Sequence, residues 1–189
     1  MKLKKNEIFS IQNIMGYFRI LLIPLFVYFY CTADGMKDYL IAGAVILLSG
    51  ITDLFDGKIA RKFNMVTELG KALDPVADKL TLCAIAFCVM FKVEIFRIVF
   101  IVMLMKELFL LAANLISMKR VGRKLDGAMW FGKICTATLY AGMILMLFFP
   151  GMPAIWQTVI AALCCAVIIG SFAMYIPVFI KMNRREELR

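Results

Sequence analysis

Six long apolar runs constrain the fold of this 189-residue chain more than any other feature. They cover residues 14–32, 38–57, 73–91, 94–117, 130–149 and 154–181. An α-helix needs about 20 apolar residues to cross about 30 Å of hydrocarbon, and each run comes close to or exceeds that length. Hydrophobic residues make up 63% of the chain, whereas a soluble domain is about 45–50% apolar. We therefore predict an all-α integral membrane protein, a single domain over residues 1–189 with six transmembrane helices.

The charges between the runs predict how these helices are oriented. Lysine and arginine gather at both termini and in the loops after the second and fourth runs, whereas the alternate loops carry fewer of them. By the positive-inside rule, both termini lie in the cytoplasm. Residues 1–12 are basic and mildly amphipathic, which predicts a short interfacial helix. No small-residue cleavage site follows, so we expect no cleaved signal peptide.

The overall charge and the missing residue types narrow the function. A net charge of +9 favours anionic partners. In a membrane protein these are lipid headgroups and phosphorylated substrates, and no nucleic-acid module is recognisable. The chain has no histidine, which excludes Ser-His-Asp and Cys-His catalysis and zinc sites built on histidine. The six cysteines form no CxxC pair, and most lie in apolar runs, as reduced packing residues do.

Four aspartates stand at the ends of the second and third runs. Asp53 and Asp56 are three residues apart, and Asp74 and Asp78 are four apart, so each pair lies on one face of a helix. Two such faces together predict an all-oxygen site for two divalent ions, Mg²⁺ or Mn²⁺. A charge inside a transmembrane helix costs about 2.5–3.5 kcal/mol. The alternative, aspartates that cap helices at the membrane surface, explains one aspartate per helix end but not two pairs.

The residues between the acid pairs suit a phosphorylated ligand. Gly57 removes a side chain next to Asp56 and would let a substrate approach the backbone, although it could also mark a helix end. Ala60 keeps the next turn small. Arg61 offers a planar donor fork for phosphate, or else is a loop charge.

The start of the third run suggests where its helix begins. Gly70 could cap the helix, form a turn or admit a ligand. Pro75 fits the first turn of a helix, which would place Asp74 at the helix mouth and Asp78 one turn deeper. Together these features predict metal-dependent transfer from an activated diphosphate at the cytoplasmic membrane surface.

The pattern of these residues resembles the complete motif of the CDP-alcohol phosphotransferase family. All eight fixed positions are present, in the order Asp53-x₂-Asp56-Gly57-x₂-Ala60-Arg61-x₈-Gly70-x₃-Asp74-x₃-Asp78. At about 6% per residue type, a chance match is on the order of 10⁻¹⁰ per starting position. The motif occupies residues 53–78 only, while the length and the six-run layout resemble the family throughout. The resemblance implies that an alcohol attacks the β-phosphate of a CDP-linked lipid and releases CMP.

The resemblance also implies roles for individual residues. The metal ligands would be Asp53, Asp56, Asp74 and Asp78, and Asp78 would also be the catalytic general base. The residues lining the CDP pocket would be Gly57, Ala60, Arg61 and Gly70, with nucleotide contacts from Asn13 and Thr67. Members of the family usually form homodimers through their membrane helices.

Three stretches resemble bacterial phosphatidylglycerophosphate synthases within this family. They are LDPVADK from Leu73, the opening QNIMGYFRILLIP with Asn13, Arg19 and Pro24, and Gly132-Lys133 followed by Thr136. The acceptor would then be glycerol 3-phosphate and the donor CDP-diacylglycerol. Candidate cations for the acceptor phosphate are Lys106, Arg120 and Lys133. Alternatively, Lys106 pairs with Glu107 or extends to the membrane surface, and Arg120 is a loop charge.

Some positions depart from the synthase pattern and leave the acceptor open. Lys106 replaces the usual arginine, a second arginine is expected near Asn114, and the opening has Gln12 and Gly16 for proline and threonine. The nearest alternative is a cardiolipin synthase of the same family, which uses phosphatidylglycerol as acceptor, and another alcohol is also possible. A transporter with an acidic cation site fits less well, because the acids cluster at one face and no inverted repeat is visible. An inactive scaffold fits poorly with four carboxylates present.

Overall fold

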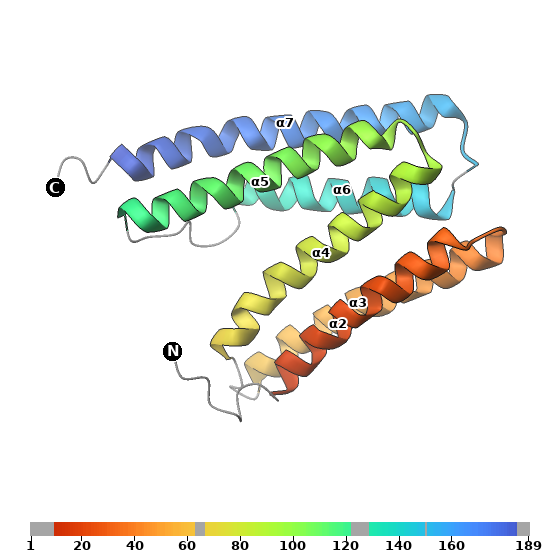
Figure 1. Cartoon of the computed structure of the whole chain (residues 1–189), viewed down its shortest axis with the longest axis horizontal. Coiled ribbons are helices and arrows are strands. Elements are labelled where there is room, and N and C mark those ends of the chain that lie inside the picture. Colours follow the sequence, from red (N-terminus) through yellow and green to blue (C-terminus); the bar gives the residue numbers. More distant parts are fainter. Residues whose placement is uncertain (1–9, 63–66, 122–128, 150, 185–189) are drawn as a thin grey trace. The chain divides into compact units, whose positions relative to one another are not determined.

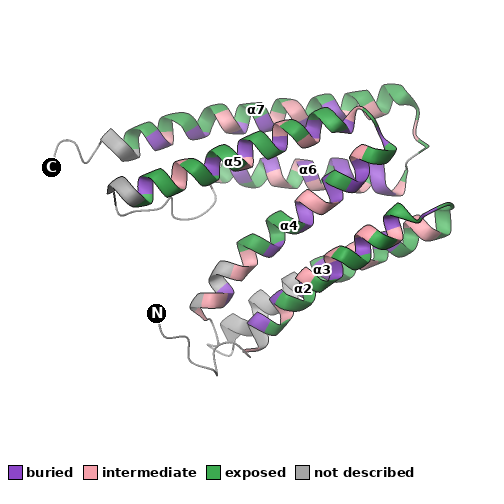
Figure 2. Ribbon diagram, viewed as in Figure 1, coloured by how far each residue is buried: buried purple, intermediate pink, exposed green. Residues whose placement is uncertain are grey.

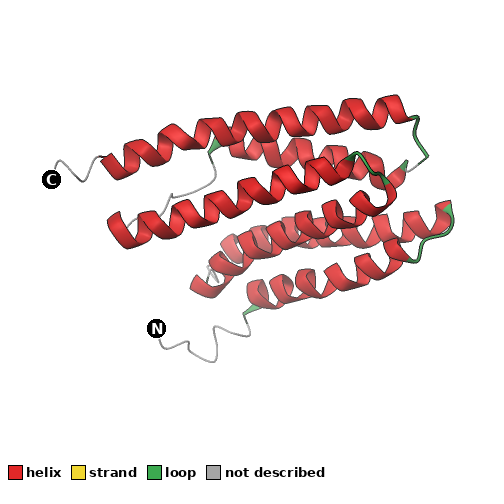
Figure 3. Ribbon diagram, turned by 45° about the horizontal axis from the view of Figure 1, so that its top comes forward, coloured by secondary structure: helices red, strands yellow, loops and turns green. Residues whose placement is uncertain are grey.

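The computed structural model is helical throughout the residues it describes, which are 10–62, 67–121, 129–149 and 151–184. Its helices, labelled as in Figure 1, are α2 (Ile11–Cys31), α3 (Met36–Lys62), α4 (Glu68–Lys92), α5 (Phe96–Val121), α6 (Trp130–Phe148) and α7 (Ala154–Arg184). No strand occurs in these ranges (Figure 3). The all-α prediction is therefore confirmed, and the described residues form six helices, as many as the apolar runs. The interfacial helix expected over residues 1–12 falls almost wholly outside the described residues.

Four of the helices are long and apolar enough to cross a membrane. By length and composition these are the spans Asn13–Cys31, Phe96–Met118, Trp130–Phe148 and Ala154–Lys181, among the residues described. Large apolar side chains are exposed on these spans, including Leu21, Met105 and Ile155, as expected of surfaces that face lipid. These are the features of a multi-pass membrane protein. The charged motif over residues 53–78 belongs to α3 and α4, and membrane crossing by these two helices stays a prediction, as does the orientation of the termini.

The two helices that carry the motif are longer than the apolar runs. Helix α3 continues to Lys62, so Gly57 lies inside it and the alternative of a helix end at Gly57 is wrong. Helix α4 begins at Glu68, so Pro75 lies about two turns inside it, and the prediction of Pro75 in the first turn with Asp74 at the helix mouth is also wrong. The reason is that an apolar run marks the part of a helix that contacts lipid or core, whereas the helix continues through charged residues as far as its caps.

The chain divides into two compact units, Met1–Cys88 and Val89–Arg189, which are described in turn. In the first unit α2 packs along α3. One face of α2 is buried from Asn13 to Tyr30 (Figure 2). Its residues recur every three or four positions, as helix geometry requires: Asn13, Gly16, Arg19, Leu22, Phe26 and Tyr30. The N-terminal half of this buried face thus carries two polar side chains, those of Asn13 and Arg19.

The second unit contains α5, α6 and α7, in which α7 packs against both of the other helices. Its buried cluster consists of Leu110, Phe131, Tyr175 and Phe179. The rings of Phe131 and Tyr175 meet edge to face with their centroids 4.7 Å apart, a favourable aromatic geometry. Gly132 lets α6 approach α7 closely, because a Cβ there would overlap the Tyr175 hydroxyl.

Gly142 is a second close approach of α6 to α7 and yields a test of this packing. A Cβ at Gly142 would lie 2.7 Å from Cys164 Sγ and 3.2 Å from Ile160 Cγ2. We therefore expect Gly142→Ala to destabilise the protein by about 1–3 kcal/mol, the usual cost of overpacking. Gly170→Ala is the matched control, because nothing lies within 4 Å of a Cβ at that position. Thermal unfolding of the purified variants in detergent measures both, and equal melting temperatures would contradict the packing of α6 on α7.

Candidate active site

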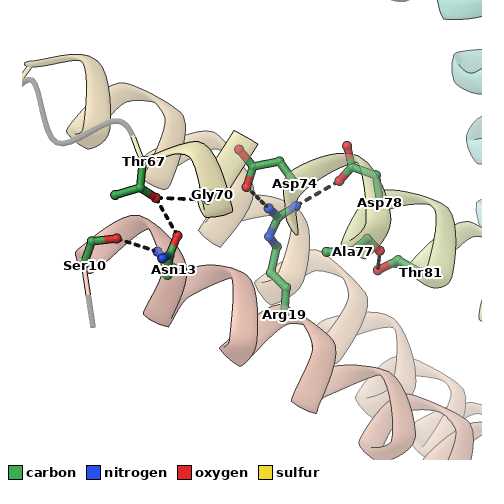
Figure 4. A network of polar contacts seen from close by, with 9 residues as sticks. All are labelled: Ser10, Asn13, Arg19, Thr67, Gly70, Asp74, Ala77, Asp78 and Thr81. Atoms are coloured by element: carbon green, nitrogen blue, oxygen red, sulfur yellow. Dashed lines mark hydrogen bonds and ion pairs between the residues drawn. The ribbon is translucent and has the colours of Figure 1, made fainter. Parts of the chain in front are cut away.

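In the first unit, a guanidinium group from α2 lies between two carboxylates of α4. Arg19 Nη2 is 3.0 Å from Asp74 Oδ1, and Arg19 Nη1 is 2.9 Å from Asp78 Oδ1. Both contacts are hydrogen-bonded ion pairs, in which the arginine donates. Figure 4 shows the two carboxylates on successive turns of α4, with the guanidinium between them. The four-residue spacing therefore places Asp74 and Asp78 on one face, as the sequence predicts.

The three charged groups differ in their access to the surroundings. The Arg19 side chain is 2% exposed, whereas those of Asp74 and Asp78 are 33% and 55% exposed. A buried guanidinium without a partner would be strongly destabilising, so the carboxylates stabilise Arg19 in the core. Each carboxylate is held by its contact with Arg19, while part of its surface stays accessible. The two acids are thus fixed in place and still able to contact a ligand.

A second polar contact joins the N-terminal ends of α2 and α4. Thr67 Oγ1 donates to Asn13 Oδ1 at 2.9 Å and accepts the Gly70 backbone N–H at 3.0 Å (Figure 4). Thr67 therefore caps α4, which explains why this helix begins at Glu68. Asn13 is fully buried, and its backbone N–H donates to Ser10 Oγ at the start of α2. The nucleotide contacts expected of Asn13 and Thr67 stay predictions.

Between these two polar contacts α2 has a glycine that faces α4. A Cβ at Gly16 would lie 3.7 Å from Leu73 Cβ, an ordinary packing distance. Ala77, one residue before Asp78, is fully buried. Thr81 returns its hydroxyl to the Ala77 carbonyl at 2.9 Å, so this buried polar group is satisfied within α4. Gly16 thus lets α2 approach α4 at Leu73, between the Asn13 and Arg19 contacts.

The other half of the predicted site lies on α3. The backbone of Asp53, Asp56, Gly57, Ala60 and Arg61 belongs to this helix, but their side chains lie outside the described residues. Whether the two acid pairs meet therefore stays a prediction. The described residues do not by themselves assemble a group of three or more potential metal ligands.

The described acids suit a divalent cation in their chemistry. Asp74 and Asp78 offer carboxylate oxygens, the donors that Mg²⁺ and Mn²⁺ prefer. Arg19 contacts both carboxylates, and the sequence adds two more acids on α3. The side chains of Asp74 and Asp78 are partly exposed, so these two carboxylates are accessible to a ligand. The residues present thus fit a site for hard cations.

The candidate phosphate ligands of the acceptor belong to the second unit. Lys106 is 5% exposed, and its Nζ lies 3.0 Å from Glu107 Oε1 and 3.8 Å from Cys135 Sγ. The local pair with Glu107, the alternative to a ligand role, is therefore formed. Lys133 is exposed on α6, whereas Arg120 lies near the end of α5 with its side chain outside the described residues.

Two residues at or near positions of the phosphatidylglycerophosphate synthase pattern form hydrogen bonds in this unit. The Thr136 hydroxyl donates to the Gly132 carbonyl at 3.1 Å. Asn114, near the position where the synthase pattern has a second arginine, donates its side-chain amide to the Leu110 carbonyl at 2.9 Å. Each contact lies within its own helix, α6 for Thr136 and α5 for Asn114. These contacts satisfy polar groups locally and do not indicate which acceptor the protein uses.

Sequence reasoning missed Arg19 as a functional candidate. From the sequence, Arg19 is named only as a residue that the stretch QNIMGYFRILLIP shares with the synthases, and it is given no role. The signal that could have found it is the cost argument applied to the aspartates, because an arginine inside an apolar run is equally expensive without a partner. The spacing of Asn13 and Arg19 on the buried face of α2 is a second signal.

The chain is similar to one protein family and to several curated proteins. The model of the CDP-alcohol phosphatidyltransferase family matches residues 9–179, which include α2 and all of the acid pairs. A protein of Rickettsia prowazekii named CDP-diacylglycerol–glycerol-3-phosphate 3-phosphatidyltransferase is 34% identical over 108 residues, 57% of this chain and 56% of that protein.

Cardiolipin synthases are also among the similar proteins. The CMP-forming cardiolipin synthase of Streptomyces coelicolor is 35% identical over 81 residues, 42% of this chain and 38% of that protein. A cardiolipin synthase and mitochondrial hydrolase fusion protein of Schizosaccharomyces pombe is 39% identical over 85 residues, 44% of this chain and 13% of that protein. The chain thus spans about half the length, or less, of these curated relatives.

Proposed function

Because this chain belongs to the CDP-alcohol phosphatidyltransferase family, we propose that it transfers a phosphatidyl group from CDP-diacylglycerol to sn-glycerol 3-phosphate. The products would be phosphatidylglycerophosphate and CMP, in phospholipid biosynthesis. The observation that carries this proposal is the pair of anchored, partly exposed carboxylates, Asp74 and Asp78, at the end of the family motif. The name of the Rickettsia prowazekii relative supports glycerol 3-phosphate as the acceptor.

The reaction exchanges one phosphorus–oxygen bond for another. The acceptor hydroxyl attacks the β-phosphorus of the CDP-lipid, and the anhydride bond to the CMP phosphate breaks as the new ester bond forms. Asp78 takes the proton from the attacking hydroxyl, for which an accessible carboxylate within hydrogen-bond reach is required. The side chain of Asp78 is the more exposed of the two described acids, which supports this role. CMP leaves with the electron pair of the broken bond.

Two divalent ions, Mg²⁺ or Mn²⁺, belong to this proposal. Asp53, Asp56, Asp74 and Asp78 would hold them. When bound, such ions neutralise charge on the phosphates and on the departing CMP. The residues of the chain supply the arrangement: Arg19 holds two of the acids, and Thr67 fixes the start of the helix that carries them.

The remaining family positions would bind the two substrates. For CDP these are Asn13, Gly57, Ala60, Arg61, Thr67 and Gly70. For the acceptor phosphate, Lys133 is exposed and Lys106 would have to exchange its Glu107 partner for the phosphate. Arg120 is the third candidate. We further propose that the protein lies in the cytoplasmic membrane with its termini and active site facing the cytoplasm, and that it forms a homodimer.

A second acceptor has specific support. Relatives from Streptomyces coelicolor and Schizosaccharomyces pombe are named cardiolipin synthases. The local Lys106–Glu107 pair, and Asn114 near the position where a second arginine is expected, also reduce the case for glycerol 3-phosphate, whose phosphate monoester carries more charge than the phosphodiester of phosphatidylglycerol. With phosphatidylglycerol as acceptor, the same attack on the same donor would give cardiolipin and CMP.

The test is CMP release from CDP-diacylglycerol by the purified protein with Mg²⁺ or Mn²⁺. Acceptors are offered one at a time: glycerol 3-phosphate, phosphatidylglycerol, inositol phosphate and serine. We expect release that depends on glycerol 3-phosphate. Release with phosphatidylglycerol alone would move the assignment to cardiolipin synthesis, and no release with any acceptor would contradict the proposed transfer.

A further inference from the structure

We propose that Arg19 is a positioning residue, which fixes the separation of Asp74 and Asp78 before any cation or substrate binds. This inference rests on the proposed function, because it takes these two acids as members of the active site. It goes beyond that function by assigning a role to a residue outside the motif of residues 53–78. Arg19 acts through the carboxylates and does not contact the reacting atoms.

The geometry supports a two-point contact. Nη1 and Nη2 belong to one rigid, planar guanidinium, and each donates to a different carboxylate, at 2.9 and 3.0 Å. The guanidinium therefore constrains the separation of the two accepting Oδ1 atoms. A lysine would keep the charge but offers a single nitrogen, so it would not fix the separation in this way.

Burial keeps the arginine itself in place. Its side chain is 2% exposed, on the buried face of α2 between Gly16 and Leu22. Packing restricts the rotamers available to a side chain in such a position, as required of a group that supports an active site. The Asn13–Thr67 contact holds the same two helices at their N-terminal ends. Arg19 thus belongs to a fixed surface of α2 against which α4 is aligned.

The charges indicate that Arg19 prepares a cation site without replacing the cation. Asp74 and Asp78 carry two negative charges on adjacent turns and would repel each other if left alone. Arg19 contacts both acids, so they are held together while their side chains stay 33% and 55% exposed and accessible to a divalent ion. Direct binding of substrate phosphate by Arg19 fits less well, since a side chain 2% exposed would have to leave both carboxylates.

The experiment compares Arg19→Lys with Arg97→Lys, a conservative control at an arginine that is 57% exposed and 3.7 Å from Glu94. Mn²⁺ binding to each purified protein is measured by electron paramagnetic resonance without substrates, and kcat and KM are measured separately. Partners that orient metal ligands are worth about 10–100-fold in affinity or activity. We expect Arg19→Lys to weaken Mn²⁺ binding and lower kcat by about this factor, with little change in the KM for CDP-diacylglycerol. Arg97→Lys should match the unmodified protein.

Several results would overturn the proposal. Unchanged Mn²⁺ affinity in folded Arg19→Lys is one, and a raised KM for CDP-diacylglycerol with normal Mn²⁺ binding, which would indicate a substrate ligand, is another. A second variant, Arg19→Gln, keeps a polar group without the charge and should weaken Mn²⁺ binding further. If neither variant folds, Arg19 acts on folding and not on positioning. An unmodified protein that releases no CMP with any acceptor would instead contradict the proposed function, and the Mn²⁺ comparison would still test Arg19.

Discussion

Replacing Asp78 with asparagine is expected to lower the rate of CMP release by about 10³-fold or more, because a general base alone contributes about 10²–10⁴-fold and a predicted metal ligand is lost as well. Asparagine has nearly the same shape but cannot take the proton of the attacking hydroxyl. The measurement is the initial rate of CMP release at saturating donor and acceptor.

The same substitution is expected to leave folding nearly intact. Asp78 is 55% exposed, and Arg19 keeps its second partner, Asp74, when Asp78 loses its charge. Asp38→Asn is the matched control: the carboxylate of Asp38 accepts the backbone N–H groups of Asp34 and Gly35, and an asparagine oxygen still accepts them. Near-normal turnover in folded Asp78→Asn would refute the assignment of Asp78, whereas equal loss in Asp38→Asn would show that the effect is not specific.

Removing divalent cations with excess chelator is expected to stop CMP release completely. In the proposed reaction the divalent ions neutralise charge on the two phosphates of CDP and on the departing CMP, and Arg61, the one cation proposed to bind CDP, carries a single charge. Activity is measured before chelation, in the chelator, and after Mg²⁺ or Mn²⁺ is added back in excess.

The control for chelation is whether the protein stays folded in the chelator. We expect little change in the melting temperature in the chelator, because the Arg19 ion pairs hold Asp74 and Asp78 without a metal. Activity should therefore return when the cation is restored. Persistent CMP release in excess chelator would rule out the proposed metal site, and loss of activity that added cation does not reverse would indicate unfolding and not catalysis.

The sequence predicted the helices well and their ends less well. Hydrophobic run length predicted six helices, because an apolar span of about 20 residues has few alternatives in a membrane. It could not predict that α3 reaches Lys62 or that α4 begins at Glu68. Those ends depend on local contacts such as the Thr67 cap, whose hydroxyl also contacts Asn13 in another helix.

The part of the candidate site formed by residues close together in sequence was predictable. The four-residue spacing predicted that Asp74 and Asp78 share a face, and one guanidinium reaches both. Their partner was not predictable from spacing, because Arg19 is 55 and 59 residues away in sequence. For Lys106 the sequence left two roles open, a phosphate ligand or a pair with Glu107. The structure shows the pair.

The most direct test of the account measures both products of one reaction. Purified protein receives CDP-diacylglycerol, radiolabelled glycerol 3-phosphate and Mg²⁺ or Mn²⁺, and both CMP and labelled lipid are quantified over time. The account predicts that the two appear in equal amounts, since each broken anhydride bond is matched by one new phosphate ester. CMP without labelled lipid would indicate hydrolysis or a different acceptor, and the absence of CMP would contradict phosphatidyl transfer by this protein.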